Sequence, residues 1–318
     1  MKSSRRFLPT VLAISLVMGS ACNATAPVVG QPPRASRAIA DPLLVAVGDI
    51  ACRPGQPRRG VPGQPRLALH CHQAAIAALI ARLAPSAIAM LGDAQYDRGT
   101  AAEFAGSFAR TWGGLRPRTH PAVGNHDYLT PGASPYFSFF GAAAAPPNGY
   151  YSYDLGAWHI VVLNSNCTYV SCATGSPQET WLRADLAAHA ARCTLAYWHA
   201  PRYSSGYNGS SLAVAPLWND LYSAGADVVL NGHDHDYERF APQNGAGRLD
   251  LARGMREFVV GTGGKDFGPM RAIKPNSVRR ANRTFGVLAL NLGATGYSWR
   301  FVPEPGATFR DAGAGSCH

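Results

Sequence analysis

Lysine is scarce in this chain: only three of its 29 basic residues are lysines, and the arginines are scattered. No RNA- or DNA-binding motif accompanies them, so no nucleic-acid partner is expected. No CxxC pair occurs, which argues against a zinc site built from cysteines. No apolar run beyond the N-terminus is long enough to span a bilayer, and no internal repeat divides the chain. What remains is a chain of 318 residues, 47% apolar, which is enough for one large core or two modest ones.

The first 22 residues are typical of a signal peptide. Three basic residues are followed by the apolar stretch Phe7–Met18, which is too short to cross a membrane. The small residues Gly19–Ala21 then precede Cys22, an arrangement that resembles a bacterial lipoprotein signal with the lipid on Cys22. Ordinary cleavage near Ala21 or Ala26 is the alternative.

Residues 23–41 are rich in Pro, Ala and Ser and predict a flexible tether. The chain is therefore expected to be exported, and to be either anchored to the membrane of a bacterial cell envelope through Cys22 or secreted. Loss of the leader leaves 26 basic against 19 acidic residues. A surface of that charge suits anionic substrates or anionic lipid.

The cysteines also favour export. Without Cys22 six cysteines remain, an even number that an oxidising compartment favours. Six cysteines allow fifteen pairings. Their loop context suggests Cys52 with Cys71 and Cys167 with Cys172, which leaves Cys193 with Cys317.

Strand-like and helix-like runs alternate after the tether, which predicts an α/β domain with a partly parallel sheet. Strands are expected at 43–47, 87–91, up to 123, 158–163, 195–198, 228–230 and 258–260, with a strand pair over 285–302 that turns near Ala294–Gly296. Helices are expected at 71–83, 101–112, 178–190 and 212–223. Residues 53–66, 128–149 and 202–211 are dense in Pro, Gly or Ser and predict loops. We expect a single domain over residues 42–318.

Five of the expected strand ends carry side chains that bind metals. Ligands of open α/β sheets bind beyond the carboxyl ends of the strands, so these side chains are expected to meet. A glycine precedes four of the five ends, which suits a tight turn. The side chains are Asp49, Asp93 with Tyr96, Asn125 with His126, His199, and His233 with His235.

Aspartate, asparagine and histidine in one crevice suit iron, zinc or manganese better than a metal that prefers thiolates. About seven candidate ligands exceed the needs of one ion, so the sequence predicts two metals. Each strand end by itself is also compatible with a turn, a helix cap or a packed histidine. The ordered set of five is what indicates a metal site.

The same ordered set resembles the calcineurin-like metallophosphoesterases. The resemblance covers about residues 43–300 and rests on Gly48-Asp49, Gly92-Asp93-Ala94-Gln95-Tyr96, Gly124-Asn125-His126-Asp127, His199 and Gly232-His233-Asp234-His235. The Tyr96 position and the stretch Asp236–Arg239 look most like the purple acid phosphatases. This resemblance implies a fold of two packed mixed β-sheets flanked by helices, in four layers.

The resemblance also implies which residues bind which ion. One metal, iron(III) in that family, takes Asp49, Asp93, Tyr96 and His235. A divalent ion, zinc, manganese or iron, takes Asp93 as a bridging ligand together with Asn125, His199 and His233. The two histidines of the Gly-His-Asp-His motif thus bind different metals, and side chains two apart in an extended segment do point the same way.

The resemblance further implies hydrolysis of phosphomonoesters by direct attack of a metal-bound hydroxide, without a phosphoenzyme. His126 is the candidate that stabilises the transition state or protonates the leaving oxygen, and Asp127 is either its orienting carboxylate or a plain loop residue. Ala51, which stands where many metallophosphoesterases have histidine, favours the purple acid phosphatases. Plant members carry adjacent histidines downstream of the His199 position, whereas residues 204–211 here contain none.

Several alternatives remain at this point. The first alternative keeps the same chemistry: the protein would be a phosphodiesterase that acts on a cyclic nucleotide or a phospholipid head group. From a different class, the protein binds metal in the envelope without catalysis. The glycine-rich stretch Gly261–Gly264 is either a turn at a strand end or a phosphate-binding backbone.

Overall fold

The structure is a computed structural model, and it describes residues 10, 12–13, 41–56, 60–61, 64–68, 71–189 and 191–318. The predicted signal peptide, the lipid site at Cys22 and the tether lie outside these residues, apart from isolated positions. Residues Ala40–His318 form one compact unit. Within the described part of the chain, no helix has the length and apolar character needed to cross a membrane.

The first sheet has six strands in the order β15-β14-β13-β1-β4-β5. β1 pairs in parallel with β4, and β4 with β5, whereas β13 to β15 join antiparallel. β1 and β4 are almost wholly buried, as expected of parallel strands that are covered on both faces. The strands are β1 (Leu43–Val47), β4 (Ala87–Leu91), β5 (Thr119–Ala122), β13 (Gly286–Gly293), β14 (Gly296–Pro303) and β15 (Ala312–Ser316).

The second sheet has seven strands in the order β12-β10-β11-β9-β8-β7-β6. β7, β8, β9 and β11 run parallel to one another, and β6, β10 and β12 are antiparallel additions. The strands are β6 (Tyr151–Leu155), β7 (Trp158–Val162), β8 (Cys193–Tyr197), β9 (Val228–Asn231), β10 (Tyr237–Phe240), β11 (Arg256–Val260) and β12 (Ser277–Ala281).

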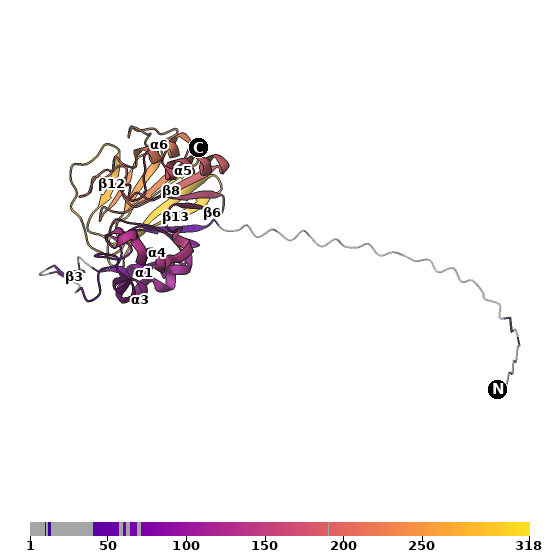
Figure 1. Ribbon diagram of the computed structural model, residues 1–318, viewed down its shortest axis with the longest axis horizontal. Coiled ribbons are helices and arrows are strands. Elements are labelled where there is room, and N and C mark those ends of the chain that lie inside the picture. Colours follow the sequence, from indigo (N-terminus) through magenta and orange to yellow (C-terminus); the bar gives the residue numbers. More distant parts are fainter. Residues whose placement is uncertain are drawn as a thin grey trace. The chain divides into compact units, whose positions relative to one another are not determined.

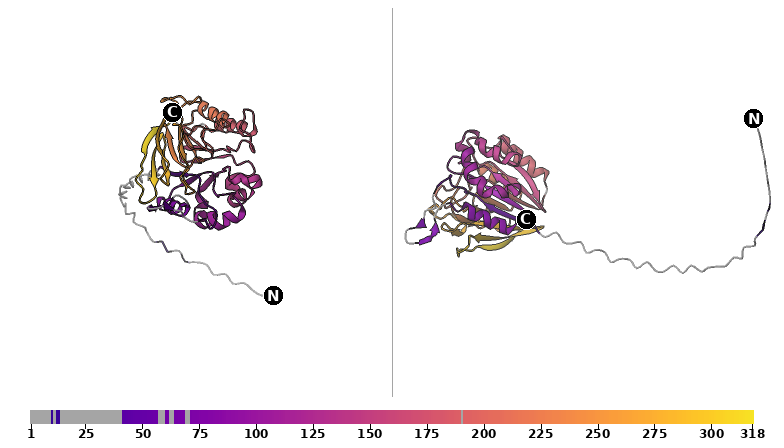
Figure 2. Two further views of the ribbon diagram at one scale, coloured as in Figure 1. Left: turned by 90° about the vertical axis from the view of Figure 1, so that its left-hand side faces the viewer. Right: turned by 90° about the horizontal axis from the view of Figure 1, so that it is seen from below.

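Helices cover the outer face of each sheet, so the molecule has four layers (Figures 1 and 2). One core lies between the sheets, where Leu44 and Leu288 meet Ile160 and Leu195. A second core packs the first sheet against α1, α3 and α4, and a third packs the second sheet against α5 and α6. The predicted fold is confirmed. The helices are α1 (Gln73–Leu83), α2 (Ala101–Glu103), α3 (Ala109–Trp112), α4 (Ser134–Phe140), α5 (Pro177–Ala188) and α6 (Ala215–Ser223), with a π-helical turn at Phe104–Phe108 between α2 and α3.

Local chemistry explains where these helices begin. Ser176 caps α5 by accepting a hydrogen bond from the Glu179 N–H, and Pro177 occupies the first turn. Thr100 and Glu103 form a reciprocal capping box at the start of α2. The helix expected from residue 71 begins at Gln73 instead, because Cys71 has a left-handed φ of 64° that no helix accepts.

Two segments predicted as loops contain regular structure. Residues 128–149 include α4, which buries Tyr136, Phe137 and Phe140, between short 3₁₀ turns. The three aromatic residues are spaced as on one face of a helix. The loop was predicted because Pro131, Gly132 and Gly141 lie around them. Residues 53–66 include β2 (Gly60–Val61) and the start of β3 (Gln64–Ala68). The strands β6, β10, β12 and β15 are also unforeseen, since β6, β12 and β15 are partly exposed and β10 has two charged residues among its four, so none is an apolar run.

The two disulfides suggested by loop context, Cys52–Cys71 and Cys167–Cys172, are present, and so is the remaining pair Cys193–Cys317. The last joins β8, in the second sheet, to the residue that follows β15, in the first. It therefore closes a loop across the whole domain, with a sequence separation of 124, whereas Cys167–Cys172 closes one with a separation of 5.

We expect the two crosslinks to differ in their effect on stability, because loop-closure entropy grows with loop length. Replacing Cys193 and Cys317 together by serine should lower the free energy of unfolding by about 5 kcal/mol, and the matched replacement at Cys167 and Cys172 by about 2 kcal/mol. Urea denaturation of both variants measures the difference. Equal losses would mean that the long disulfide does not act through the unfolded chain.

Candidate metal centre

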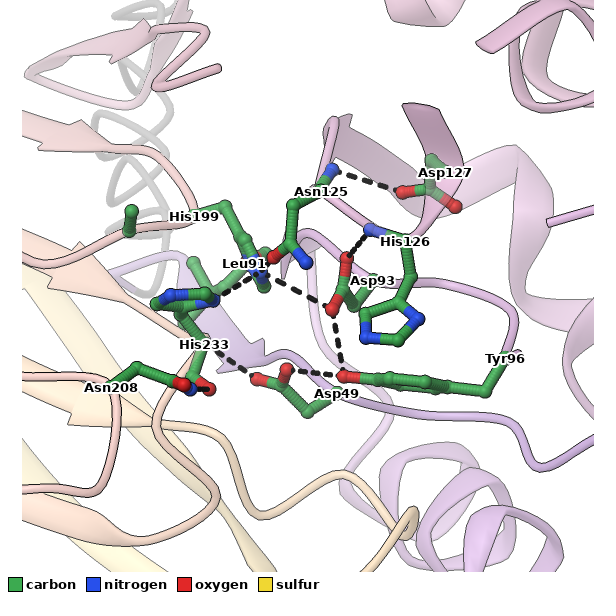
Figure 3. A network of polar contacts seen from close by, with 12 residues as sticks. Asp49, Leu91, Asp93, Tyr96, Asn125, His126, Asp127, His199, Asn208 and His233 are labelled. Carbon is green, nitrogen blue, oxygen red and sulfur yellow. Dashed lines mark hydrogen bonds and ion pairs between the residues drawn. The ribbon is translucent and has the colours of Figure 1, made fainter. Parts of the chain in front are cut away.

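The five predicted strand ends meet at one place, with three ends from the first sheet and two from the second. The loop after β1 carries Asp49, the loop after β4 carries Asp93 and Tyr96, and the loop after β5 carries Asn125. In the second sheet His199 follows β8, while His233 and His235 follow β9. Figure 3 shows side chains from these loops turned toward one another. All seven predicted ligands are brought together.

The backbone of the ligand loops is unusual at the ligands themselves. Asp49, Asp93 and His233 have φ values of 61°, 48° and 72°, in the left-handed region that residues with a Cβ rarely adopt. Such conformations persist only where the surrounding structure holds them, and they concentrate at functional sites. The glycines before them have a further role, because a Cβ at Gly92 would overlap the His199 ring.

Tyr96 is the centre of a first ligand group. Its hydroxyl lies 2.8 Å from Asp49 Oδ1, 2.8 Å from Asp93 Oδ2 and 2.9 Å from His235 Nε2. Tyr96, Asp49 and Asp93 are buried. These four residues are the set that the resemblance assigns to iron(III).

His199 is the centre of a second ligand group. Its Nε2 lies 2.9 Å from Asn125 Oδ1, 3.2 Å from His233 Nδ1 and 3.3 Å from Asp93 Oδ2. These four residues are the set assigned to the divalent ion. Asp93 is the member that both groups share, as a bridging ligand requires.

Backbone and carboxylate acceptors fix the histidine rings. His199 Nδ1 donates to the Leu91 carbonyl at 2.8 Å, which directs Nε2 into the site. His235 Nδ1 donates to the Asp266 carboxylate and directs its own Nε2 toward Tyr96. Partners of this kind orient histidines that bind metals. Asp266 was missed by sequence reasoning, because no motif marks it and only the folded chain brings it to His235.

The electrostatics favour positive charge next to the two buried carboxylates. Burial lowers the pKa of His199, but Asp93 outweighs it and raises the value to about 9. Burial also lowers the pKa of His235, but Asp49 and Asp266 outweigh this effect and raise the value to about 10. Burial raises the pKa of the Asp93 carboxyl, yet His199, His126 and Tyr96 together hold it well below its usual range.

The geometry of this chain alone therefore indicates that the site can bind metal ions. Ligand atoms of Asp49, Asp93 and His199 all lie within 4.8 Å of one another, and all three residues are buried. Without a metal, protons on His199 and His235 balance the negative charge of the carboxylates. Metal ions can replace those protons. Oxygen and imidazole donors are the types that iron, zinc and manganese accept.

His126 lies beside the ligands rather than among them. Its ring stacks at a tilt on Tyr96, with centroids 4.3 Å apart, and its backbone N–H donates to Asp93 Oδ1 at 2.8 Å. Its Nδ1 donates to the carbonyl of Asp97 at 2.6 Å, so Nε2 is the nitrogen left for the pocket.

Asp127 is buried and its carboxylate accepts a hydrogen bond from the Gly124 N–H at 2.9 Å. The ring partner of His126 in the structure is the Asp97 carbonyl. Orienting this ring was one of the two roles considered for Asp127, and that of a plain loop residue was the other. Burial and the charge of Asp93 raise the pKa of Asp127 to about 8. The hydrogen bond from the Gly124 N–H to Asp127 holds the turn that carries Asn125 and His126.

A cavity of about 370 Å³ opens over both ligand groups. Its lining consists of five of the predicted ligands and, in addition, His126, Tyr207, Asn208 and the segment 266–269. Gly261–Gly264 is not part of its lining. The N–H groups of Gly261 and Gly263 donate to the carbonyls of Asp236 and Gly48, so this stretch is a turn at a strand end.

Gly124 gives a direct test of the shared ligand. A Cβ at this position would overlap both the backbone nitrogen and Oδ1 of Asp93. We expect Gly124→Ala to displace Asp93 and to lower bound metal at least about 10-fold, as changes around metal ligands commonly do. Metal analysis of the purified variant measures this, and Gly113→Ala is the control because nothing lies within 4 Å of its added Cβ. Unchanged metal content in Gly124→Ala would contradict the role of Asp93.

Sequence comparison agrees with this geometry. The chain matches the model of the calcineurin-like phosphoesterase family over residues 44–237. It is 36% identical to purple acid phosphatase 15 of Arabidopsis thaliana over 110 residues, which are 32% of this chain and 20% of the relative. It is also 36% identical to purple acid phosphatase 21 of the same plant over 137 residues, 41% of this chain and 30% of the relative. The chain thus spans less than a third of the length of either relative.

Structural comparison gives the same fold. A purple acid phosphatase from yellow lupin (Lupinus luteus) seeds superposes with a TM-score of 0.69 over 86% of this chain and 53% of that chain, at 17% identity. The likeness at this identity concerns the architecture, two mixed sheets with helices on both outer faces.

Proposed function

Because this chain belongs to the calcineurin-like phosphoesterase family, we propose that it is an exported, dinuclear metal-dependent phosphatase that hydrolyses phosphomonoesters. The observation that carries the proposal is the pair of ligand groups around Tyr96 and His199, which share Asp93. Two-metal sites of this kind serve in-line displacement at phosphorus. The similarity to plant purple acid phosphatases supports the choice of a phosphatase.

In this proposal the residues divide between the ions as the resemblance implies. Asp49, Asp93, Tyr96 and His235 would hold iron(III), while Asp93, Asn125, His199 and His233 would hold a divalent zinc, manganese or iron ion. When bound, the ions supply positive charge for the phosphoryl oxygens and lower the pKa of a water molecule. The chain's contribution is to hold these ligands in a buried cluster, where charge interacts more strongly than in water.

His126 would act on the leaving group. Its Nε2 is available because Nδ1 is engaged by the Asp97 carbonyl, and the residue lines the cavity next to the ligands. A proton on Nε2 can stabilise charge on the phosphoryl group or pass to the departing oxygen. We propose that Asp127 assists by fixing the turn through the Gly124 N–H, so that the imidazole keeps its position.

Export is part of the proposal as well. Its support is the leader over residues 1–22 and the three disulfides, which persist in oxidising compartments. A lipid on Cys22 would tether the enzyme to the envelope, and cleavage near Ala21 or Ala26 would release it.

The test is hydrolysis of an aryl phosphate monoester and the matching diester, side by side, by the protein beginning at residue 38. Preference for the monoester, abolished in Asp93→Asn, is the expected result. Preference for the diester would make the protein a phosphodiesterase. Two bound metals without hydrolysis of either ester would favour the non-catalytic metal-binding protein.

A further inference from the structure

The lining of the cavity next to the predicted metal ligands includes an exposed aromatic ring. Tyr207 lines the cavity and is 55% exposed, so packing in the core does not explain it. It stands close to the ligands: a Cβ added at Gly268 would lie 3.7 Å from Tyr207 Cβ and 3.9 Å from His235 Cβ. The next residue, Asn208, donates from Nδ2 to the carbonyl of His233 at 2.8 Å.

The loop that carries Tyr207 is held by three buried carboxylates. Glu257 accepts hydrogen bonds from the N–H groups of Arg202 and Tyr203, at 2.9 and 3.1 Å. Glu238 accepts from the N–H and hydroxyl of Ser205, at 2.7 and 2.6 Å.

Asp234, from the Gly-His-Asp-His motif, is the third of these carboxylates. It accepts from the N–H groups of Asn208 and Gly209, at 2.6 and 3.1 Å, and from the hydroxyl of Ser204. Hydrogen bonds to these carboxyl groups on both sides of Tyr207 therefore fix its backbone before any ligand arrives. Binding to a pre-organised residue avoids the entropy of ordering a loop.

A guanidinium group lies against the same ring. The Cζ atom of Arg271 is 4.6 Å from the centroid of Tyr207, within the range of a cation–π contact. Arg271 is tied to the loop by its backbone N–H, which donates to the carbonyl of Ser205 at 2.7 Å. Tyr207, which lines the cavity, thus has on its ring a guanidinium group whose residue is itself bonded to the same loop.

We propose that Tyr207, with Arg271 against its ring, forms a stacking platform for a planar aromatic leaving group, so that the preferred substrates are nucleoside monophosphates. This inference rests on the proposed phosphatase function and names its substrate class. Aromatic and guanidinium planes stack on nucleobases with little regard to sequence, because every base has a π-face. The cavity of about 370 Å³ is within the range of pockets that hold small ligands, and it exceeds what a phosphate group alone requires.

The chain supplies a matched control residue. Tyr169 is 61% exposed and stacks on Tyr128 with centroids 4.3 Å apart, but it does not line the cavity. Single exposed aromatic residues are ordinary on protein surfaces. Comparing Tyr207 with Tyr169 therefore separates a substrate platform from a surface residue.

The catalytic test compares adenosine 5′-monophosphate with glycerol phosphate. In the intact protein we expect KM to be lower for the nucleotide. Tyr207→Ala should raise the KM for the nucleotide about 10- to 100-fold, the effect of losing one base stack, and leave glycerol phosphate unchanged. Tyr207→Phe should restore the nucleotide KM, since the ring and not the hydroxyl stacks, and Tyr169→Ala should alter neither substrate. Equal losses for both substrates in Tyr207→Ala would overturn the platform.

A binding measurement separates this inference from the proposed function. Saturation-transfer NMR with adenosine, which has no phosphate, should detect contact with the intact protein and with Tyr207→Phe, but not with Tyr207→Ala. Adenosine binding without any ester hydrolysis would leave the platform standing and remove the phosphatase proposal. Hydrolysis of glycerol phosphate and nucleotide with the same KM, without adenosine binding, would leave the phosphatase standing and remove the platform.

Discussion

Asp93→Asn is expected to lose both metal ions and to lower phosphatase activity more than about 100-fold. Changes in residues that merely support a metal ligand cost about 10- to 100-fold, so loss of the shared ligand should exceed that range. The amide keeps an oxygen that can accept from the His126 N–H, but it removes the negative charge between the Tyr96 and His199 groups. Metal content by mass spectrometry and steady-state rates measure the two effects.

The control for Asp93→Asn is Asp154→Asn, the same chemical change at an exposed carboxylate of β6. It should retain metal and rate. Far-ultraviolet circular dichroism of both variants separates loss of metal from loss of fold. Full activity in Asp93→Asn would refute the assignment of the site.

His126→Ala is expected to keep both metals and to lower kcat by about 10²- to 10⁴-fold, the usual contribution of a general acid. In the proposed division of ligands the ring binds neither metal, and the contacts around Tyr96 and His199 do not include it. If His126 protonates the leaving oxygen, the loss should be large for alkyl phosphates and small for aryl phosphates whose phenol is a good leaving group. Rates across a series of leaving groups measure this dependence.

His189→Ala, at the end of α5 and outside the cavity lining, is the matched histidine control and should not change the rate. A fall in metal content in His126→Ala would make the role of the residue structural. A uniform loss across all leaving groups would indicate that His126 stabilises the phosphoryl charge and does not transfer a proton.

The ligand set could be predicted because it lies in short motifs at the ends of strongly apolar strands. Leu43–Val47 and Ala87–Leu91 were predicted with the bounds that the structure gives, and each is followed directly by glycine and aspartate. Parallel strands place such ends at one edge. Partly exposed strands of the same length, such as β12 and β15, have no comparable apolar run.

The sequence by itself determined the residue types, their order along the chain and hence the α/β class and the seven candidate ligands. Only the tertiary structure decided which atoms meet, because contacts such as His235 with Asp266, or His126 with the Asp97 carbonyl, depend on how loops pack and leave no local signal. The same holds for the platform, since the carboxylates that fix Tyr207 come from β10, β11 and the loop after β9, and no sequence pattern indicates which loop they hold. Periodicity reports which face of an element is buried, whereas loop packing is set by contacts distant in sequence.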